Sequence, residues 1–255
     1  MKKNELVNLL NKEFVFSNQE EWDKCGANLY QDENITNILI SLDVTQDVID
    51  FAINNNCNTI ITHHPILVND NNPESHINIY NQYLIDNLVK NNILHICLHT
   101  CFDKYKFGTS YQIYKSFNIP KEDIASEGWI LDYIYYFELK NSATLNDYLS
   151  KFNNKYTSQI KYLKEQKNKE IKKIAIGAGS CSSFLDLLPN YNIDCFLTGD
   201  IKWHSYIDAY NLNISIIDIN HYAELVFVEF ISKYISNNFN LKTLNFNKTL
   251  NIETK

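Results

Sequence analysis

The sequence predicts an α/β protein built as two lobes, each with a mainly parallel sheet covered by helices. Short apolar runs of strand length alternate with segments of helical spacing, as is typical of parallel sheets with both faces covered. The 255 residues suffice for one large domain or two modest ones. Because the alternation is interrupted in the middle and then resumes, we expect lobes at 1–125 and 126–255, with the option that the last part of the chain packs back onto the first lobe.

The first lobe is predicted to hold three buried strands joined by helices. An amphipathic helix at 3–13 opens the chain, and Thr45 is a suitable N-cap for the helix after the first strand. The strands are expected at 35–45, 57–64 and 93–100, and the further helices at 45–56, 75–92 and 108–119.

The second lobe is expected to start with a less regular segment. Its first part has a strand at 129–140, a helix at 143–154, a strand at 157–165, and a charged stretch at 165–173 that indicates a linker or exposed turn. The alternation then resumes with strands at 174–179, 195–200 and 214–220, and helices at 182–190, 201–211 and 221–238.

Composition limits the classes of protein. The formal net charge of −7 disfavours broad nucleic-acid binding, which depends on Lys and Arg facing phosphates. The N-terminus has no long apolar region of a signal peptide, and no apolar run reaches membrane-spanning length, so we expect a cytoplasmic protein. None of the six cysteines forms a CxxC pair, and most lie in apolar runs, so we interpret them as reduced core residues.

Chemistry-bearing side chains gather where the predicted strands end. Ligands of open α/β sheets bind beyond the carboxyl ends of the strands. Five of the seven histidines lie at such ends, and acidic residues accompany them. The residues in chain order are Asp43, His63, His64, His99, Asp103, Asp200, His204, His221 and Glu224.

This combination of imidazoles and carboxylates indicates a metal site. Without thiolates it suits Zn, Mn, Fe, Co or Ni. His221 and Glu224 are three residues apart and share one face if a helix begins there, and Asp103 is able to bridge two ions. Pro65 ends the strand after His63 and His64, so each imidazole is free to take a different ion of a hydrolytic pair that acidifies a bridging water.

Several of these residues and motifs also have simpler structural interpretations. A single strand-end histidine is usually a hydrogen-bonded surface residue, Asp43 serves equally well as a helix cap, and His95 is best interpreted as a core or flanking residue. The segment GAGSCSS at 177–183 is either an anion cradle or, preferably, a tight turn. EWDKCG at 21–26 indicates only a loop with an aromatic anchor.

Five motifs in order give the chain a resemblance to a known family. They are EWDKCG at 21–26, SLDVT at 41–45, ITHHP at 61–65, HTCFD at 99–103, and LTGDIKWH at 197–204 running on to IDINHYAEL at 217–225. Together they resemble the NGG-interacting-factor-three-like (NIF-three-like) family, whose members are often called GTP cyclohydrolase I type 2. The resemblance extends from about residue 20 to about residue 230.

The resemblance implies two similar lobes with mixed, mainly parallel sheets and a dinuclear metal site in the cleft between them. It implies the ligands His63, His64, Asp103, His221 and Glu224, and a ring-shaped homohexamer. The segment 128–165 is too short for the domain that some relatives insert, so a compact form is expected. Asn220 stands where the family usually has Gly before the ligand histidine, and Asn tolerates a positive φ there.

These observations predict a metal-dependent hydrolase with two divalent ions per chain, resembling GTP cyclohydrolase I type 2. Its nucleophile would be a metal-bound hydroxide and its substrate an unidentified small molecule, with a nucleotide as one option. His99, Asp200 and His204 are the candidates for proton transfer or substrate positioning. The alternative is a ring-forming scaffold or regulatory protein that contacts nucleic acid or other partners and holds metal structurally.

Overall fold

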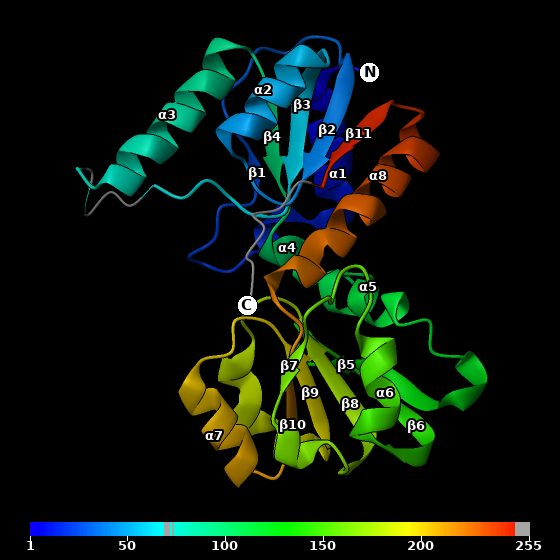
Figure 1. The fold of residues 1–255 in the computed structure, drawn as a ribbon. Helices are drawn as coiled ribbons and strands as arrows, with labels where there is room; N and C mark the ends of the chain where they lie inside the picture. The colour runs from blue at the N-terminus through cyan, green and yellow to red at the C-terminus, as the bar shows by residue number, and fades with distance from the viewer. Residues whose placement is uncertain (69–71, 73, 248–255) are drawn as a thin grey trace. The chain divides into compact units, whose positions relative to one another are not determined.

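The computed structural model describes residues 1–68, 72 and 74–247, which form two compact units. Unit 1 comprises Met1–Tyr105 and Phe227–Lys255, and unit 2 comprises Lys106–Val226. Each unit contains one mixed sheet covered by helices, so the predicted α/β class is confirmed (Figure 1). The limits of the units differ from those of the predicted lobes, because the C-terminal helix and strand belong with the N-terminal sheet.

Unit 1 contains a five-stranded sheet in the order β1-β4-β3-β2-β11. The four strands β4, β3, β2 and β11 run parallel, and only the two-residue β1 runs antiparallel, pairing with β4. The strands are β1 (Gly26–Ala27), β2 (Asn37–Ser41), β3 (Cys57–Thr62), β4 (Leu94–Cys97) and β11 (Thr243–Phe246). Since β2, β3 and β4 are parallel neighbours, their carboxyl ends meet at one edge.

Helices cover both faces of this sheet. They are α1 (Lys3–Phe14), α2 (Gln46–Asn54), α3 (His76–Lys90), α4 (Thr100–Asp103) and α8 (Val226–Phe239). The helices α2 and α3 pack on Leu39 and Ile60, and α1 meets α8 through Phe14 and Tyr234, whose ring centroids are 5.3 Å apart. Figure 1 shows α2 and α3 on one side of the sheet and α1 and α8 on the other.

Unit 2 contains a six-stranded sheet in the order β5-β6-β8-β9-β10-β7. Its strands are β5 (Ile124–Ile130), β6 (Ile134–Thr144), β7 (Lys161–Tyr162), β8 (Glu170–Gly177), β9 (Cys195–Thr198) and β10 (Ser215–Asp218). The central strands β8, β9 and β10 run parallel, and β5, β6 and β7 add antiparallel pairs at the edges. The unit is therefore more mixed than unit 1.

Two apolar clusters bury the faces of the second sheet. Phe137 and Ile174 belong to the cluster beneath α5 (Thr109–Ser116) and α6 (Leu145–Phe152), and Ala175 and Phe196 belong to the cluster on the other face. Neighbouring residues of β8 thus enter different clusters, as expected for a strand covered on both faces. The second cluster lies beneath the 3₁₀ helix η4 (Ser182–Tyr191) and α7 (Trp203–Asn211).

The middle of the chain differs from its sequence-based prediction. The single strand expected at 129–140 is a hairpin, in which Ile130 pairs with Ile134. Its turn passes through Leu131, which adopts a φ of 57°. Leucine rarely takes that conformation. The turn also contains no Gly, Pro or Asn that would indicate it in the sequence. The strand expected at 157–165 shortens to β7, and part of the charged stretch at 165–173 belongs to β8.

The long helix expected at 221–238 is divided. A 3₁₀ helix, η5 (His221–Leu225), precedes α8. Separately, among the described residues no helix combines the length and the apolar character needed to cross a membrane.

Candidate metal centre

His63 and His64 follow β3 directly. The strand ends at Thr62, so the two histidines escape strict alternation, and their ring centroids are 5.1 Å apart. His63 is fully buried, whereas the side chain of His64 is 20% exposed. Two adjacent imidazoles are thus able to lie in one group at a strand end.

The tautomer of His63 is fixed by a backbone carbonyl. Its Nδ1 lies 3.0 Å from the carbonyl oxygen of Leu98, which only accepts hydrogen bonds, so Nδ1 carries the proton. In the neutral ring, Nε2 then holds the lone pair, and it lies 3.6 Å from Oδ1 of Asp103. Asp103 stands at the end of α4, and its own side chain is 16% exposed.

His64 is oriented by a carboxylate. Its Nδ1 lies 2.7 Å from Oδ1 of Asp43, which follows β2 by two residues. Of the two interpretations of Asp43, the structure favours the one in which it orients an imidazole, since the N-cap of α2 is Thr45, whose side chain accepts from Val48 N–H. A carboxylate on Nδ1 leaves Nε2 of the neutral ring as the basic nitrogen.

His99 is oriented by a second carboxylate from a distant loop. Its Nδ1 lies 3.0 Å from Oδ1 of Asp23, and Oδ2 of Asp23 accepts a hydrogen bond from Thr100 N–H at 2.9 Å and another from the Thr100 hydroxyl. Burial raises the pKa of Asp23, but the hydrogen bonds from His99 and Thr100 outweigh it and hold the pKa well below 3.8. Asp23 is therefore an anion at neutral pH.

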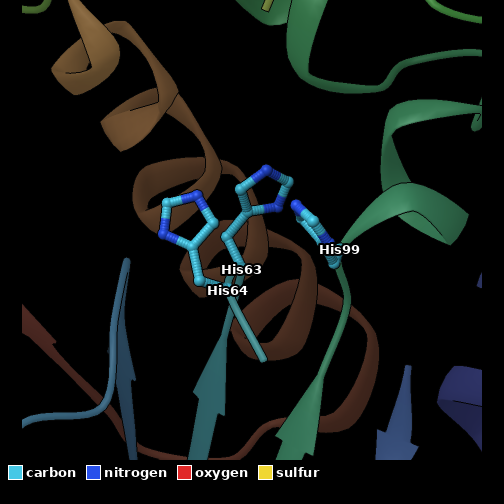
Figure 2. A group of neighbouring side chains, drawn as sticks. All are labelled: His63, His64 and His99. Carbon is cyan, nitrogen blue, oxygen red and sulfur yellow. The ribbon is translucent and has the colours of Figure 1, made fainter. Parts of the chain in front are cut away.

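The three histidines form one group at the carboxyl edge of the first sheet. His63, His64 and His99 each offer a ring nitrogen, and these atoms all lie within 4.8 Å of one another. Figure 2 shows the three rings gathered side by side. The sequence placed His99 at this edge as a proton-transfer candidate, and the structure brings it as close to His63 as His64 is, with ring centroids 5.1 Å apart in both pairs.

Unit 2 holds a second donor group at the start of η5. Nε2 of His221 lies 3.1 Å from Oε2 of Glu224, three residues later, and Nδ1 lies 2.6 Å from Oδ2 of Asp200. The short 3₁₀ helix produces the shared face that the spacing predicts for an α-helix. Glu224 is nearly buried, with 5% of its side chain exposed.

Two residues with positive φ shape this group. Asn220, immediately before His221, has a φ of 58°, so the Asn maintains a turn for which Gly is the usual residue. Its N–H donates to Oδ1 of Asp218 at 2.8 Å. Asp200 has a φ of 51°, which aims its carboxylate at His221.

The glycine segment at 177–183 packs against the acid of this group. A Cβ on Gly179, whose φ is +60°, would lie 2.5 Å from Oε1 of Glu224. The carbonyl of Gly179 accepts from Gly199 N–H at 2.8 Å and from the Thr198 hydroxyl at 2.9 Å. These contacts agree with a tight turn, in which the missing Cβ of Gly179 leaves space for the carboxylate of Glu224.

The remaining candidates, Asp200 and His204, both lie in unit 2. Asp200 contacts His221 directly, which suits an orienting role, and His204 is exposed on α7. Asp23 was missed as a functional residue, since its loop offers only Trp22 and a nearby Gly as signals. The ring of Trp22 lies 5.7 Å from that of His99.

The donor atoms present fit a divalent transition metal. Imidazole nitrogens and carboxylate oxygens are the ligands that such ions prefer when thiolates are absent. All four histidines of the two groups have Nδ1 beside an oxygen acceptor, an arrangement typical of metal-binding imidazoles.

Comparisons with known proteins identify the family of the chain. A family model described as Duf34/NIF3 (NGG1p interacting factor 3) matches residues 1–253. A relative from Ureaplasma parvum, named GTP cyclohydrolase 1 type 2 homolog, is 35% identical over 262 residues, which cover 99% of this chain and 96% of the relative.

Solved structures share the fold over the whole chain. The crystal structure of Staphylococcus aureus hypothetical protein SA1388 matches with a TM-score of 0.83 and 25% identity, covering 100% of this chain and 99% of that one. A Bacillus cereus protein related to NIF3 matches in fold with a TM-score of 0.84 and 16% identity, with the same coverage of 100% and 99%.

Proposed function

Since the chain belongs to the Duf34/NIF3 family, we propose that it is a dinuclear metal-binding protein that hydrolyses a small-molecule substrate. The observation that carries this proposal is the common setting of the three strand-end histidines proposed as ligands. The Nδ1 atoms of His63, His64 and His221 each lie 2.6–3.0 Å from an oxygen acceptor. A histidine that is buried only for packing does not require an oxygen acceptor at Nδ1. A histidine that binds a metal usually has one, because it orients the ring.

The proposed ligands are His63, His64, Asp103, His221 and Glu224. Support within unit 1 comes from the 3.6 Å approach of His63 Nε2 to Asp103, and within unit 2 from the 3.1 Å approach of His221 Nε2 to Glu224. Each approach joins an imidazole to an acid with a weakly exposed side chain, 16% for Asp103 and 5% for Glu224. A cation would favour such a pair by neutralising the carboxylate.

The proposed cofactors are two divalent ions per chain, drawn from Zn, Fe, Mn, Co and Ni. When bound, such ions would supply Lewis-acid chemistry for hydrolysis. The protein's own part is orientation, since Asp43 and Asp200 fix the rings of His64 and His221 through their Nδ1 atoms.

Proton transfer is assigned to His99. Its Nδ1 is hydrogen-bonded to Asp23, a buried anion, and this contact fixes the orientation of the ring. Nε2 is therefore the nitrogen that we propose as the general base. Asp200 is proposed as a positioning residue for His221, and His204, exposed at the start of α7, as a residue that positions substrate.

A nucleotide is the substrate class that the relatives suggest, because several carry the name GTP cyclohydrolase 1 type 2 homolog. The competing proposal is a metal-binding scaffold or regulatory protein without turnover. Nucleic acid is a poor partner for either, given the net charge of −7.

Self-association into a ring-shaped homohexamer is proposed from the resemblance. Exposed apolar side chains on α3 support an interface, with Ile77 73% and Ile79 56% exposed. Light scattering that gives a monomer mass at micromolar concentration would reject it. The six free thiols fit a reducing compartment, and we propose the cytoplasm.

The decisive experiment compares the wild type with Asp103→Asn after loading with each candidate metal. Both proteins are incubated with GTP and a panel of nucleotides and phosphate esters, and the products are followed by chromatography. Asp103→Asn keeps the size of the side chain and removes the charge that bridging requires. Asp50→Asn, an exposed acid on α2, is the matched control.

The hydrolase proposal expects turnover of at least one compound by wild type and Asp50→Asn, with a loss of about 100-fold or more in Asp103→Asn. Equal turnover in all three proteins would reject the role of Asp103. Consumption of no compound by any metal form, with metal bound, would favour the scaffold.

A further inference from the structure

Three cysteines of unit 1 gather beside the carboxylate that orients His99. Cys25 lies two residues after Asp23, Cys97 ends β4, and Cys101 lies in α4. The strand pairing of Gly26 with Cys97 brings the Cys25 loop to the end of β4. Segments about 75 residues apart in sequence thus place thiols in one cluster, which we call the thiol cluster.

The thiol cluster touches the framework of the histidine group at two points. Sγ of Cys25 lies 3.4 Å from Oδ2 of Asp23, and Sγ of Cys97 lies 3.1 Å from the carbonyl oxygen of His63. Cys25 also lies within interaction range of the Cys101 thiol and backbone N–H and of the Cys97 thiol. Cys25 is therefore the centre of the cluster.

Cys25 is also the accessible member. It is half-buried, whereas Cys97 and Cys101 are each 2% exposed. A pocket of about 490 Å³ is lined by Cys25 together with Cys97, Lys24 and Gln19. A small polar reagent can therefore reach the Cys25 sulfur, while the buried Cys101 does not line this pocket.

The hydrogen bonds favour the thiolate of Cys25. Those from Cys101 and Cys97 hold the pKa of Cys25 well below its usual value, although burial and the Asp23 charge oppose them. Burial raises the pKa of Cys57 to about 11 and raises that of Cys195 as well. The thiolate is the reactive form of cysteine, so Cys25 is distinguished from the structural thiols.

We propose that Cys25 and Cys101 form a reversible disulfide when the protein meets a peroxide. The Cys25 thiolate attacks one peroxide oxygen, the O–O bond breaks, and a sulfenic acid forms as the other oxygen leaves as hydroxide or alkoxide. The Cys101 sulfur then attacks the Cys25 sulfur, the S–O bond breaks, and the oxygen leaves with a proton as water. The two thiols are oxidised and the peroxide is reduced.

The disulfide would act on the histidine group through Asp23, an effect that rests on the proposed metal function. In the reduced protein, Cys25 contacts the same Asp23 oxygen that Thr100 binds. Drawing Cys25 toward Cys101 moves its sulfur away from that oxygen and disturbs the carboxylate that holds Thr100 at the start of α4, the helix that ends at the proposed ligand Asp103. The expected consequence is weaker metal binding, by about tenfold.

Peptide mapping tests the bond itself. Chelator-treated full-length protein receives stoichiometric hydrogen peroxide, free thiols are alkylated, and the chain is digested. Trypsin leaves Cys25 and Cys57 on residues 25–90 and Cys97 and Cys101 on residues 91–104. A second protease that cuts at Asp32 or Glu33 then separates Cys25 from Cys57.

The expected product is a Cys25–Cys101 linkage that dithiothreitol reverses, present in Cys97→Ser and Cys57→Ser and lost in Cys101→Ser and Cys25→Ser. Unchanged alkylation of Cys25 after peroxide would overturn the proposal. Conversion of wild-type Cys25 to sulfinic acid without a linkage would also overturn it, and so would a bond from Cys25 to Cys97 in the wild type.

Zinc titration of the oxidised and reduced wild type tests the coupling to the site. An affinity at least about tenfold weaker in the oxidised form supports the coupling, and equal affinities reject it. Failure of both forms to bind zinc or any other candidate metal would defeat the proposed metal function while leaving the mapped disulfide standing.

Discussion

Nδ1 of His99 lies 3.0 Å from Oδ1 of Asp23, although the two residues are 76 positions apart in the sequence. The same carboxylate accepts both the N–H and the hydroxyl of Thr100. One buried anion therefore fixes the orientation of an imidazole and the first residue of α4. Because α4 ends at Asp103, this contact also supports a proposed metal ligand.

Asp23→Ala is expected to lower the free energy of unfolding by about 2–4 kcal/mol. The substitution leaves the N–H and hydroxyl of Thr100 without their acceptor in a buried setting, and hydrogen bonds to charged groups contribute about 1.5–3 kcal/mol each. Urea denaturation at neutral pH measures the effect, with Asp50→Ala as an exposed control. A change below about 0.5 kcal/mol would contradict the structural role of Asp23.

His99→Gln separates proton transfer from metal binding. If His99 moves protons, the variant retains the metal content of the wild type and loses turnover by about 100-fold or more. Elemental analysis and turnover of a substrate found in the nucleotide screen are measured on the same preparation. His76→Gln, on the exposed start of α3, is the control. Loss of an ion from His99→Gln would make His99 a ligand instead.

Gly179→Ala tests the close approach of the glycine turn to Glu224. The added Cβ would lie 2.5 Å from Oε1 of Glu224, at a φ of +60° that is strained for alanine. We expect a loss of about 1–3 kcal/mol in the free energy of unfolding and weaker metal binding.

Gly128→Ala is the matched control for that variant, because the three atoms nearest to its Cβ all belong to the Tyr136 side chain, the nearest at 3.3 Å. Chemical denaturation and a metal titration give the two readouts. A Gly179→Ala protein that matches Gly128→Ala in both would contradict the proposed packing of the turn.

The strand-end positions followed from the sequence because they depend on a simple regularity. Apolar runs at 57–64 and 93–100 predict parallel strands, and the carboxyl ends of parallel strands share an edge. His63, His64 and His99 therefore meet as a group. Asp43 was recognised for the same reason, since it follows the neighbouring strand.

Features that depend on tertiary contacts could not be predicted from the sequence. Nothing local distinguishes Asp23 from a surface loop acid, and its role depends on a partner 76 residues away. The hairpin turn at 131–133 offers only Asp132 as a turn signal, and the φ of 57° at Leu131 is set by the pairing of β5 and β6. The return of β11 to the first sheet likewise depends on its parallel pairing with β2.

Stability is expected to fall as the pH is lowered from neutral, through His95. Burial lowers the pKa of His95 to about 4 from 6.5, so between these values the unfolded chain binds the proton and the folded chain does not. The free energy of unfolding therefore decreases with falling pH, by up to about 1.4 kcal/mol per unit from this residue.

His95→Leu should remove that contribution. The Nε2 of His95 lies 2.8 Å from the Thr62 hydroxyl, which donates to the His64 carbonyl and so keeps that partner in the variant. Urea denaturation of metal-free protein at about pH 7 and about pH 5 should show the wild type losing about 2 kcal/mol more than His95→Leu. Equal losses would mean that His95 is protonated in the folded chain.

The central claim is that the clustered histidines and acids bind a pair of metal ions. The most direct measurement is elemental analysis of full-length protein that is purified without chelator, supplied with divalent metals and passed through a desalting column. The account predicts about two divalent ions per chain. Fewer than about one ion per chain, with every candidate metal supplied, would contradict it.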